Sequence, residues 1–419
     1  MAEKLANSDQ ASVVSAVRML LPKFAGRISA AEENRCIPRE SIEELHEAGF
    51  FKWFVPKRYG GFEWLPKPVY EVAIEMGAVC ASTAWVSLLL SVHNHLLALM
   101  DPRAQDDVWG EDPKALVSSS FAPVGNVRTV KGGFELTGRW PFSSGVDHCK
   151  WAIVSSRIDG QPGREAFFLV SNKQYAINDN WFVSGMKATG SKEMVMEGVF
   201  VPGYRAITHH ALNFGDPPGR AVNNVPLYWV PFLPLFTWVI CVHALGPAIS
   251  VRNDYIKSTL RRVSAYSGDK LRDRQLSMAR LAEATAEIDS AQLLFTRDFD
   301  AMEQSAALRR RMASPGFSRA KFDAVYALEL SSRALDRLWR ASGAHALFQN
   351  SSIQRNFRDI HAMSQHGGAD IDSAYSDYGR FLLDPEGIFR AAGIACPAET
   401  RPATDRNESQ IVGGEKWFR

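Results

Sequence analysis

The 419-residue sequence has few cysteines and no glycine-rich nucleotide-binding motif. The cysteines stand at positions 36, 80, 149, 241 and 396, too far apart for a Cys-x-x-Cys metal or redox site and too few for a disulfide scaffold. This usage indicates reduced thiols and gives no reason to predict a metal site. No Gly-x-Gly-x-x-Gly segment opens a βαβ pattern, which excludes a nicotinamide site of the Rossmann type.

A charge excess of either sign is also missing. Lysine and arginine together number 48, aspartate and glutamate 46, so the formal net charge is only +2. Such a balance creates no overall field that would attract nucleic acid or an anionic membrane. We therefore expect neither as a partner.

Long hydrophobic runs are scarce. The first residues, Met1 to Asn7, lack the apolar core of a signal peptide. The most apolar run, Pro226 to Ala248, is interrupted by Pro231, Pro234 and His243, so its unbroken pieces fall far short of the roughly 20 residues that span a bilayer. We expect this run to form a buried helix and the protein to be cytoplasmic.

Hydrophobic periodicity divides the rest of the chain. Apolar residues recur at helical spacing up to about residue 112, and the stretch from Ala84 to His95 is apolar nearly all round, which predicts a helix inside the domain. From Leu116 to about Val201 the period changes to two, as in a small antiparallel β domain. After Pro202 the helical period returns.

Long helices rich in leucine and alanine are predicted near 236–265, 274–304 and 316–347, a pattern typical of a bundle. The predicted fold is therefore mainly α with a central β domain. Its parts are an N-terminal helical domain (1–114), a central β domain (115–205), a C-terminal four-helix bundle (206–383) and a partly loose tail (384–419).

Two clusters of hydroxyl residues stand at strand edges in the β part. The first is Ser118-Ser119-Ser120, followed by an aromatic residue, and the second is Ser143-Ser144, preceded by one. Hydroxyl and backbone N–H groups can bond the heteroatoms of a flat ring system, while small side chains let the main chain come close. The pattern favours a wall that faces a flavin, with ordinary turn serines as the alternative.

The order and length of these parts resemble the acyl-CoA dehydrogenase fold. Within it, the chain resembles the oxygenase components of two-component, flavin-dependent aromatic monooxygenases, such as the 4-hydroxyphenylacetate and secosteroid phenol hydroxylases. The motifs that carry this resemblance are Tyr59-Gly60-Gly61, Thr83-Ala84-Trp85, Val92-His93-Asn94, Val108 to Pro113, Ser118 to Ser120, Ser143 to His148, Thr189-Gly190-Ser191 and Ile353 to Asp359.

The resemblance implies an enzyme that uses reduced flavin, FADH2 or FMNH2, with O2 as co-substrate. In this family a C4a-hydroperoxyflavin hydroxylates the aromatic ring, here expected to be phenolic or indolic, inside a dry pocket. The family also implies a separate NAD(P)H-flavin reductase as partner and a homotetramer. The long helices alone merely allow a tetramer.

By motif position, the resemblance assigns catalytic roles to Ser144 and His366, which would protect the oxygenated flavin. It assigns His93 to the substrate hydroxyl, where an imidazole would favour the phenolate. The alternatives are a plain loop histidine at position 366 and a satisfied core histidine at position 93. Ser119 and Phe236 are further expected substrate contacts, although Phe236 is equally compatible with apolar packing.

The expected cofactor contacts have structural alternatives as well. Trp85 could be plain core packing, and Arg262, expected at the flavin phosphates, could be a solvated helix end. One relative has an arginine near the flavin where this chain has Leu233, so any charge that this arginine supplies must come from elsewhere. The full predicted set is Trp85, Ser118, Ser120, Ser143, Ser144 and Arg262.

Other functions stay open at this stage. Many dehydrogenases of the fold carry a catalytic glutamate eight residues after an Arg-Asp pair, but counting from Asp359 puts Gly367 there, and glycine cannot abstract a proton. Asp370 and Asp372 are near that position, though not at it. A non-enzymatic helical protein, or an oxygenase acting on nitrogen or sulfur, are the remaining alternatives.

Overall fold

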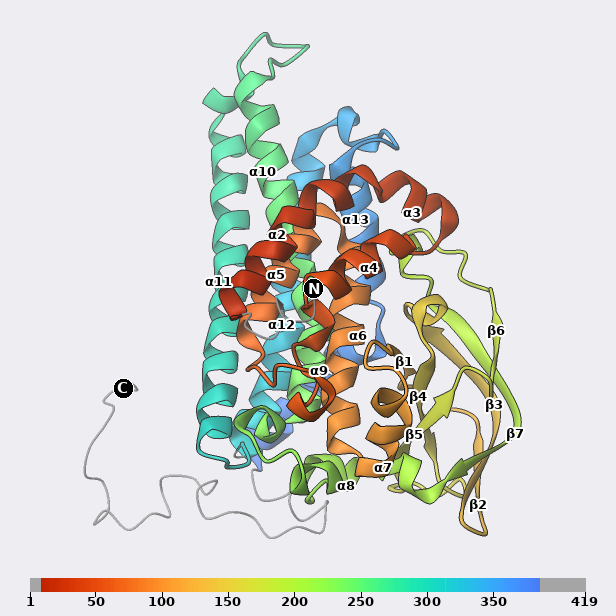
Figure 1. Cartoon of the computed structure of the whole chain (residues 1–419). Coiled ribbons are helices and arrows are strands. Elements are labelled where there is room, and N and C mark those ends of the chain that lie inside the picture. The colour runs from red at the N-terminus through yellow and green to blue at the C-terminus, as the bar shows by residue number, and fades with distance from the viewer. Residues whose placement is uncertain (1–8, 313, 385–419) are drawn as a thin grey trace, which may run out of the picture.

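Helix α6 (Ala81–Leu99) lies at the centre of the protein, between the β region and the long helices of the bundle (Figure 1). The computed structural model describes residues 9–312 and 314–384. All 19 residues of α6 are buried, as its all-round apolar sequence predicts. It contains no glycine or proline and stops before Pro102, as helix propensities require.

The other N-terminal helices surround α6 on one side. They are α2 (Gln10–Gly26), α3 (Ile28–Asn34), α4 (Arg39–Glu47), α5 (Lys67–Val79) and α7 (Pro102–Gln105). Besides α5, α6 contacts α9 of the bundle and strand β1. A side chain on α6 can therefore reach all three parts of the protein.

The β region consists of two four-stranded sheets, ordered β1-β4-β5-β8 and β2-β3-β7-β6. Its pairs are antiparallel except β1 with β4. A second hydrophobic core, around Trp140 and Phe168, lies between the sheets. The strands are β1 (Val117–Ser120), β2 (Asn126–Val130), β3 (Gly133–Ser143), β4 (Trp151–Arg157), β5 (Glu165–Ser171), β6 (Ala176–Asn178), β7 (Lys192–Pro202) and β8 (Ala206–Thr208).

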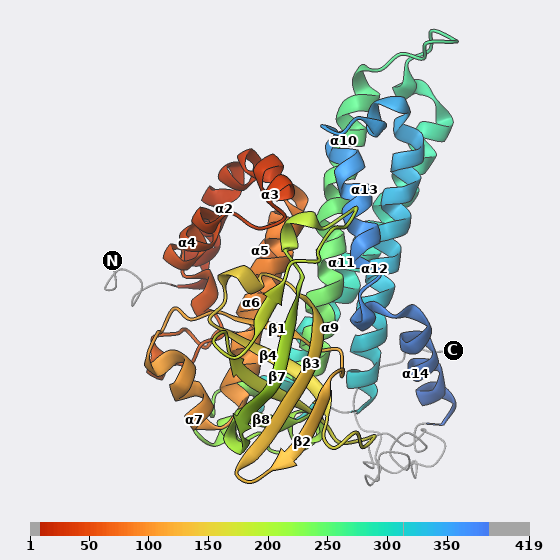
Figure 2. The ribbon, with the colours of Figure 1, turned by 90° about the vertical axis from the view of Figure 1, so that its right-hand side faces the viewer.

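The C-terminal helices form a bundle beside the β region (Figure 2). The single helix predicted at 236–265 is in fact two, because a 3-10 turn at Val242–Ala244 separates α9 from α10. The apolar stretch Phe232–Arg261 is long enough to span a membrane, but 89% of its most apolar window is buried, as in a core helix. The helices are α8 (His209–Asn213), α9 (Phe232–Cys241), α10 (Leu245–Arg261), α11 (Gln275–Ala307), α12 (Ser314–Ser342), α13 (Ser352–Met363) and α14 (Ile371–Leu383).

The expected boundaries at 114, 205 and 383 remain predictions. In the described part of the chain, strands occur between Val117 and Thr208 and helices occur on both sides. The expected loose tail lies outside the described residues, apart from Asp384.

A buried carboxylate joins the bundle to the β region. Asp359 of α13 accepts a hydrogen bond from the backbone N–H of Met186, with 2.7 Å between Oδ1 and N. Next to this bond the two backbones nearly touch, since a Cβ on Gly185 would lie 2.1 Å from the carbonyl oxygen of Arg358. Burial raises the pKa of Asp359 to about 6. The segment before β7 is thus held by α13.

Buried histidines should make the protein acid-labile. Burial lowers the pKa of His46, His93, His95 and His366 to about 4 and that of His243 to about 3. Between pH 6.5 and 4 the unfolded chain takes up protons that the folded chain does not, so the free energy of unfolding falls as the pH falls. Each histidine contributes about 3 kcal/mol to this loss.

Two buried carboxyl groups act in the opposite direction. The pKa of Asp359 is raised to about 6 and that of Asp298 to about 7, mainly by burial, so their contribution to stability is lost as the pH rises. Because five histidines outweigh two carboxyl groups, urea unfolding between pH 7.5 and 4.5 should show a net loss at low pH. His243→Leu should reduce the loss, and a flat profile would contradict the account.

The bond between Asp359 and Met186 predicts a difference between two variants. Asp359→Ala leaves the buried Met186 N–H without an acceptor and should lower the free energy of unfolding by about 2 kcal/mol at pH 7. Asp359→Asn keeps an acceptor oxygen and removes a buried charge, so it should cost less than about 1 kcal/mol. Chemical unfolding of both variants measures this. Equal losses would show that the hydrogen bond contributes little.

Candidate active site

Trp85, Ser144 and His366 come together from three parts of the chain. Trp85 projects from α6, Ser144 follows the end of β3, and His366 lies in the turn between α13 and α14. The Trp85 indole Nε1 donates to Ser144 Oγ at 3.1 Å. The ring centroids of Trp85 and His366 are 5.7 Å apart, in an edge-to-face arrangement. The two residues assigned to the oxygenated flavin therefore contact the same indole.

The turn that carries Ser144 needs Gly145. This glycine has φ +69°, and a Cβ there would lie 2.7 Å from Cγ1 of Val86 on α6. Its backbone N–H donates to the carbonyl oxygen of Thr189 at 2.9 Å. The turn is thus pressed against α6 and tied to the segment before β7, which places the Ser144 hydroxyl at Trp85.

His366 carries its proton on Nε2. Its Nδ1 accepts a hydrogen bond from the Gly368 backbone N–H at 2.9 Å, so Nδ1 is unprotonated. The pKa of His366 is lowered to about 4 by burial of the ring, although the residue as a whole keeps partial exposure. A neutral imidazole with this tautomer has an Nε2–H donor, for which no described residue is an acceptor.

His93 has the opposite tautomer. Its Nδ1 lies 2.7 Å from the carbonyl oxygen of Val117, which can only accept, so Nδ1 carries the proton. Burial lowers the pKa of His93 to about 4, which leaves Nε2 with a lone pair. The Ser119 hydroxyl, 2.8 Å away, donates to it. Ser119 and His93 thus form an acceptor unit, and the serine oxygen keeps its own lone pairs.

An aromatic wall surrounds this unit. The Phe236 ring of α9 stacks toward His93 with centroids 6.3 Å apart, and Phe121 stands edge-on to His93 at 5.6 Å. Phe121 and Phe236 contact each other at 4.6 Å. The predicted substrate residues His93, Ser119 and Phe236 are therefore neighbours, in apolar surroundings with one polar corner.

The remaining predicted serines point away from Ser119. Because side chains alternate along a strand, Ser118 and Ser120 of β1 share the opposite face. Ser120 Oγ donates to the carbonyl oxygen of Pro141 at 2.6 Å. The hydroxyls of Ser118 and Ser143 are buried and have no hydrogen-bond partner among the described residues.

Arg262 is not part of this cluster. It follows α10, whose C-terminal end lies at the end of the bundle farthest from the β region (Figures 1 and 2). Its guanidinium donates to the carbonyl oxygen of Ser342. Leu233, noted as a departure from a relative, is 39% exposed. The phosphate role of Arg262 remains a prediction.

The polar groups of the cluster suit a flavin. An isoalloxazine ring has both hydrogen-bond donors and acceptors on its edge, and unpartnered buried hydroxyls are costly unless a ligand meets them. Ser118 and Ser143 supply two such hydroxyls, and His366 supplies a free Nε2–H. When bound, reduced flavin supplies the electrons that activate O2.

No carboxylate stands where a dehydrogenase would need one. Gly367, at the position of the glutamate, begins a short 3-10 turn. Asp370 is exposed and caps α14, with its carboxylate accepting from the backbone N–H groups of Asp372 and Ser373. Asp372 is exposed too. The geometry therefore offers no base for α-proton abstraction at this place.

Some residues of the cluster were not predicted as site residues. His243 is fully buried, lies 5.5 Å from Trp85 between ring centroids, and has no partner at either nitrogen among the described residues. In the sequence it is only an interruption of an apolar run. Ser191 and Thr189, which belong to a recognised motif, bond to Ser144 directly and through one another. Phe121 directly follows the serine cluster, which is the signal that could have identified it.

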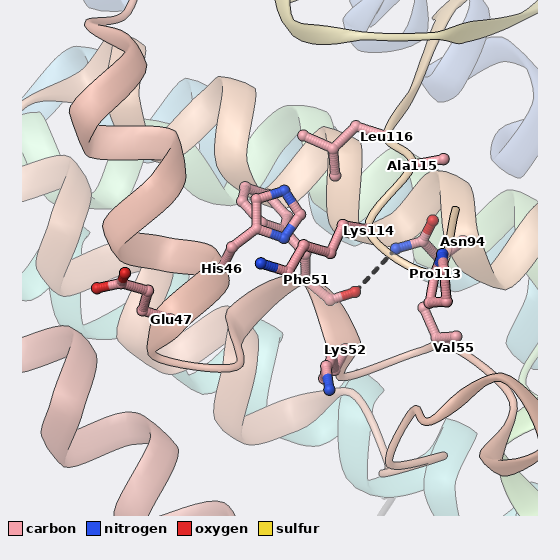
Figure 3. Close-up of a pocket in the computed structure, with 10 residues that line it drawn as sticks. All are labelled: His46, Glu47, Phe51, Lys52, Val55, Asn94, Pro113, Lys114, Ala115 and Leu116. Atoms are coloured by element: carbon pink, nitrogen blue, oxygen red, sulfur yellow. Dashed lines mark hydrogen bonds between the residues drawn. The ribbon is translucent and has the colours of Figure 1, made fainter. Parts of the chain in front are cut away.

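A separate cavity of about 220 Å³ opens beside α4 and shares no lining residue with this cluster (Figure 3). Asn94, the neighbour of His93 on α6, donates from Nδ2 to the Phe51 carbonyl oxygen at 2.9 Å in its wall. The lining residues are His46, Glu47, Phe51, Lys52, Val55, Asn94, Pro113, Lys114, Ala115 and Leu116.

Sequence comparisons identify both helical parts. Residues 7–102 match the family model "Acyl-CoA dehydrogenase, N-terminal domain" and residues 238–371 match "Acyl-CoA dehydrogenase, C-terminal domain". The chain is 36% identical to the flavin-dependent monooxygenase oxygenase subunit HsaA of Mycobacterium tuberculosis, over 90% of this chain and 97% of the relative. It is 31% identical to the p-hydroxyphenylacetate 3-hydroxylase oxygenase component of Acinetobacter baumannii, over 90% of each.

Solved structures agree with this result. The crystal structure of HsaA from M. tuberculosis superposes with a TM-score of 0.86 at 36% identity, covering 90% of this chain and 98% of that one. XiaF from Streptomyces sp., solved in complex with FADH2 and glycerol, gives 0.82 at 27% identity, covering 89% and 95%. The predicted fold class, enzyme class and flavin dependence are confirmed. The chain belongs to the oxygenase components of flavin-dependent monooxygenases that have the acyl-CoA dehydrogenase fold, which use O2 as co-substrate and work with a separate reductase.

Proposed function

We propose that this oxygenase component hydroxylates the ring of a small phenol. The observation that carries the proposal is the pair formed by Ser119 and His93, placed against Phe121 and Phe236. Aromatic rings favour an aromatic guest, and the Ser119 oxygen offers the guest a hydrogen-bond acceptor. Relatives named for p-hydroxyphenylacetate and resorcinol support the same substrate class.

The pair makes the ring more reactive by polarising its hydroxyl. A phenol that donates to Ser119 Oγ is linked through the serine proton to His93 Nε2, while Val117 holds the other nitrogen. Because the pKa of His93 is only about 4, the imidazole attracts the proton without removing it fully. Electron density on the phenol oxygen rises and passes to the ortho carbon of the ring, the position expected to receive oxygen.

Ser144 and His366 are proposed to face the flavin. Both contact Trp85, and His366 has an Nε2–H directed away from Gly368, to which its Nδ1 is bonded. The orphan hydroxyls of Ser118 and Ser143 support a polar-edged ring nearby. The apolar surroundings exclude water, which favours transfer of oxygen to the substrate over loss as hydrogen peroxide.

The wider assignments follow from family membership. The reductase partner is proposed to be an NAD(P)H-flavin reductase, and the protein is proposed to be a cytoplasmic homotetramer. Oxidation of an indole remains a second candidate, because one relative is named indole-3-acetate monooxygenase and the aromatic wall would also accept indole. Nothing in the wall favours nitrogen or sulfur oxidation over these.

The role of Ser119 predicts selectivity for a free hydroxyl. With reduced flavin supplied by any reductase, a panel of phenols, indoles and amines is screened by mass spectrometry for the gain of one oxygen. A phenol that reacts should react at least about 10-fold better than its methyl ether, since the ether cannot donate to Ser119 and one such bond contributes about 1.4 kcal/mol. Equal turnover of both compounds would contradict the proposed substrate contact.

His93→Ala should uncouple the enzyme. Reduced flavin and O2 should still be consumed, but product per O2 should fall about 10-fold or more and hydrogen peroxide should rise, because the phenol hydroxyl is no longer polarised. Quantifying product and peroxide from one reaction measures this. His95→Phe, a change at a second buried histidine of α6, is the matched control and should keep normal coupling. Unchanged coupling in His93→Ala would remove its substrate role.

A further inference from the structure

The Ser144 hydroxyl stands at one end of a chain of three buried hydroxyls. Ser144 Oγ lies 2.8 Å from Ser191 Oγ, and Ser191 Oγ lies 2.7 Å from Thr189 Oγ1. Thr189 Oγ1 then bonds the carbonyl oxygen of Met186 at 2.8 Å. At the other end, Trp85 Nε1 bonds Ser144. The chain thus begins at an indole N–H and ends at a carbonyl oxygen.

Both ends fix the direction of every hydrogen bond. A carbonyl oxygen can only accept, so the single proton of Thr189 goes to Met186. The contact between Thr189 and Ser191 must then use the proton of Ser191. The contact between Ser191 and Ser144 must in turn use the proton of Ser144. Since the Trp85 indole can only donate, no alternative direction satisfies all four bonds.

The last acceptor of the chain is firmly held. Met186 is anchored through its backbone N–H, which donates to the buried carboxylate of Asp359. Its carbonyl oxygen also accepts from Trp181 Nε1 at 3.2 Å. The carbonyl therefore cannot turn away and release the Thr189 proton without breaking bonds to two other parts of the protein.

Ser144 consequently has no proton left for a ligand. Its hydroxyl donates to Ser191 and accepts from Trp85, so its one remaining position is a lone pair. The two oxidation states of flavin differ at one ring atom in this respect. N5 of oxidised flavin is an acceptor, whereas N5 of reduced flavin carries a hydrogen and is a donor.

We propose that Ser191 and Thr189 determine the redox specificity of flavin binding by making Ser144 an acceptor only. Reduced flavin can donate to the free lone pair of Ser144, whereas oxidised flavin would set a lone pair against a lone pair. The proposal rests on the placement of Ser144 at the flavin under the proposed function. It assigns Ser191 and Thr189 as positioning residues, since both act through Ser144.

The test compares the binding of two oxidation states in one protein. Dissociation constants are measured for oxidised FAD and FMN by fluorescence titration, and for the dithionite-reduced flavins under anaerobic conditions. The wild type should bind reduced flavin at least 10-fold more tightly than oxidised flavin. In Ser191→Ala the Ser144 proton becomes free to meet an acceptor, so the ratio of the two constants should fall about 10-fold, mainly through tighter binding of oxidised flavin.

Three further variants separate this effect from a general disturbance. Thr189→Val removes the acceptor for the Ser191 proton and should also lower the ratio. Ser87→Ala, which removes a buried hydroxyl of α6 bonded to the Thr83 carbonyl at 2.7 Å, should leave it unchanged. In a Ser144→Ala background, adding Ser191→Ala should have no further effect, because the group through which Ser191 acts is gone.

Each outcome bears on a different statement. An unchanged ratio in a folded Ser191→Ala protein that still binds reduced flavin would overturn the redox-specificity role and leave the proposed function standing. Failure of the wild type to bind either flavin would overturn the proposed function, and this inference with it. A parallel loss of affinity for both oxidation states would show that Ser191 only maintains the local structure, which also overturns the inference.

Discussion

The hydrogen bond between the Trp85 indole and Ser144 is the interaction on which the site depends. It joins the central helix α6 to the end of β3 at the point where the turn before α14 also arrives. A buried indole N–H without an acceptor would cost roughly 1 to 3 kcal/mol, so the bond favours one relative placement of the β region and α6. The same bond uses one lone pair of Ser144, which makes it part of the chemistry as well as of the packing.

Burial gives the two catalytic histidines different roles without any charged partner. Both are neutral at pH 7, because a dry environment disfavours the imidazolium. Their tautomers are set by single backbone groups, a carbonyl oxygen at His93 and an N–H at His366. One histidine therefore offers a lone pair at Nε2 and the other offers a proton there. A polar phenol and an oxygen-loaded cofactor need these two different partners.

The sequence predicted the parts of the fold better than their junctions. Helix α6 was recognisable because it is apolar on every face, and the β region because its period changes to two. The break at Val242–Ala244 was missed, since an apolar run carries no signal for a 3-10 turn. The roles of Ser118, Ser119 and Ser120 depend on which face of β1 each occupies, and that is set by pairing with β4, far along the chain.

The site residues show the same limit. Family motifs located Ser144, His366 and His93, but no local pattern indicates that Asp359 holds Met186 across 173 positions of sequence. That contact fixes the carbonyl oxygen that ends the hydroxyl chain, and the carbonyl fixes the proton of each hydroxyl before it. The hydrogen-bonding character of Ser144 is thus decided by a carboxylate on a different domain. A site of this kind can be read only after the long-range contacts are known, because the property that matters is the direction of a proton and not the identity of a residue.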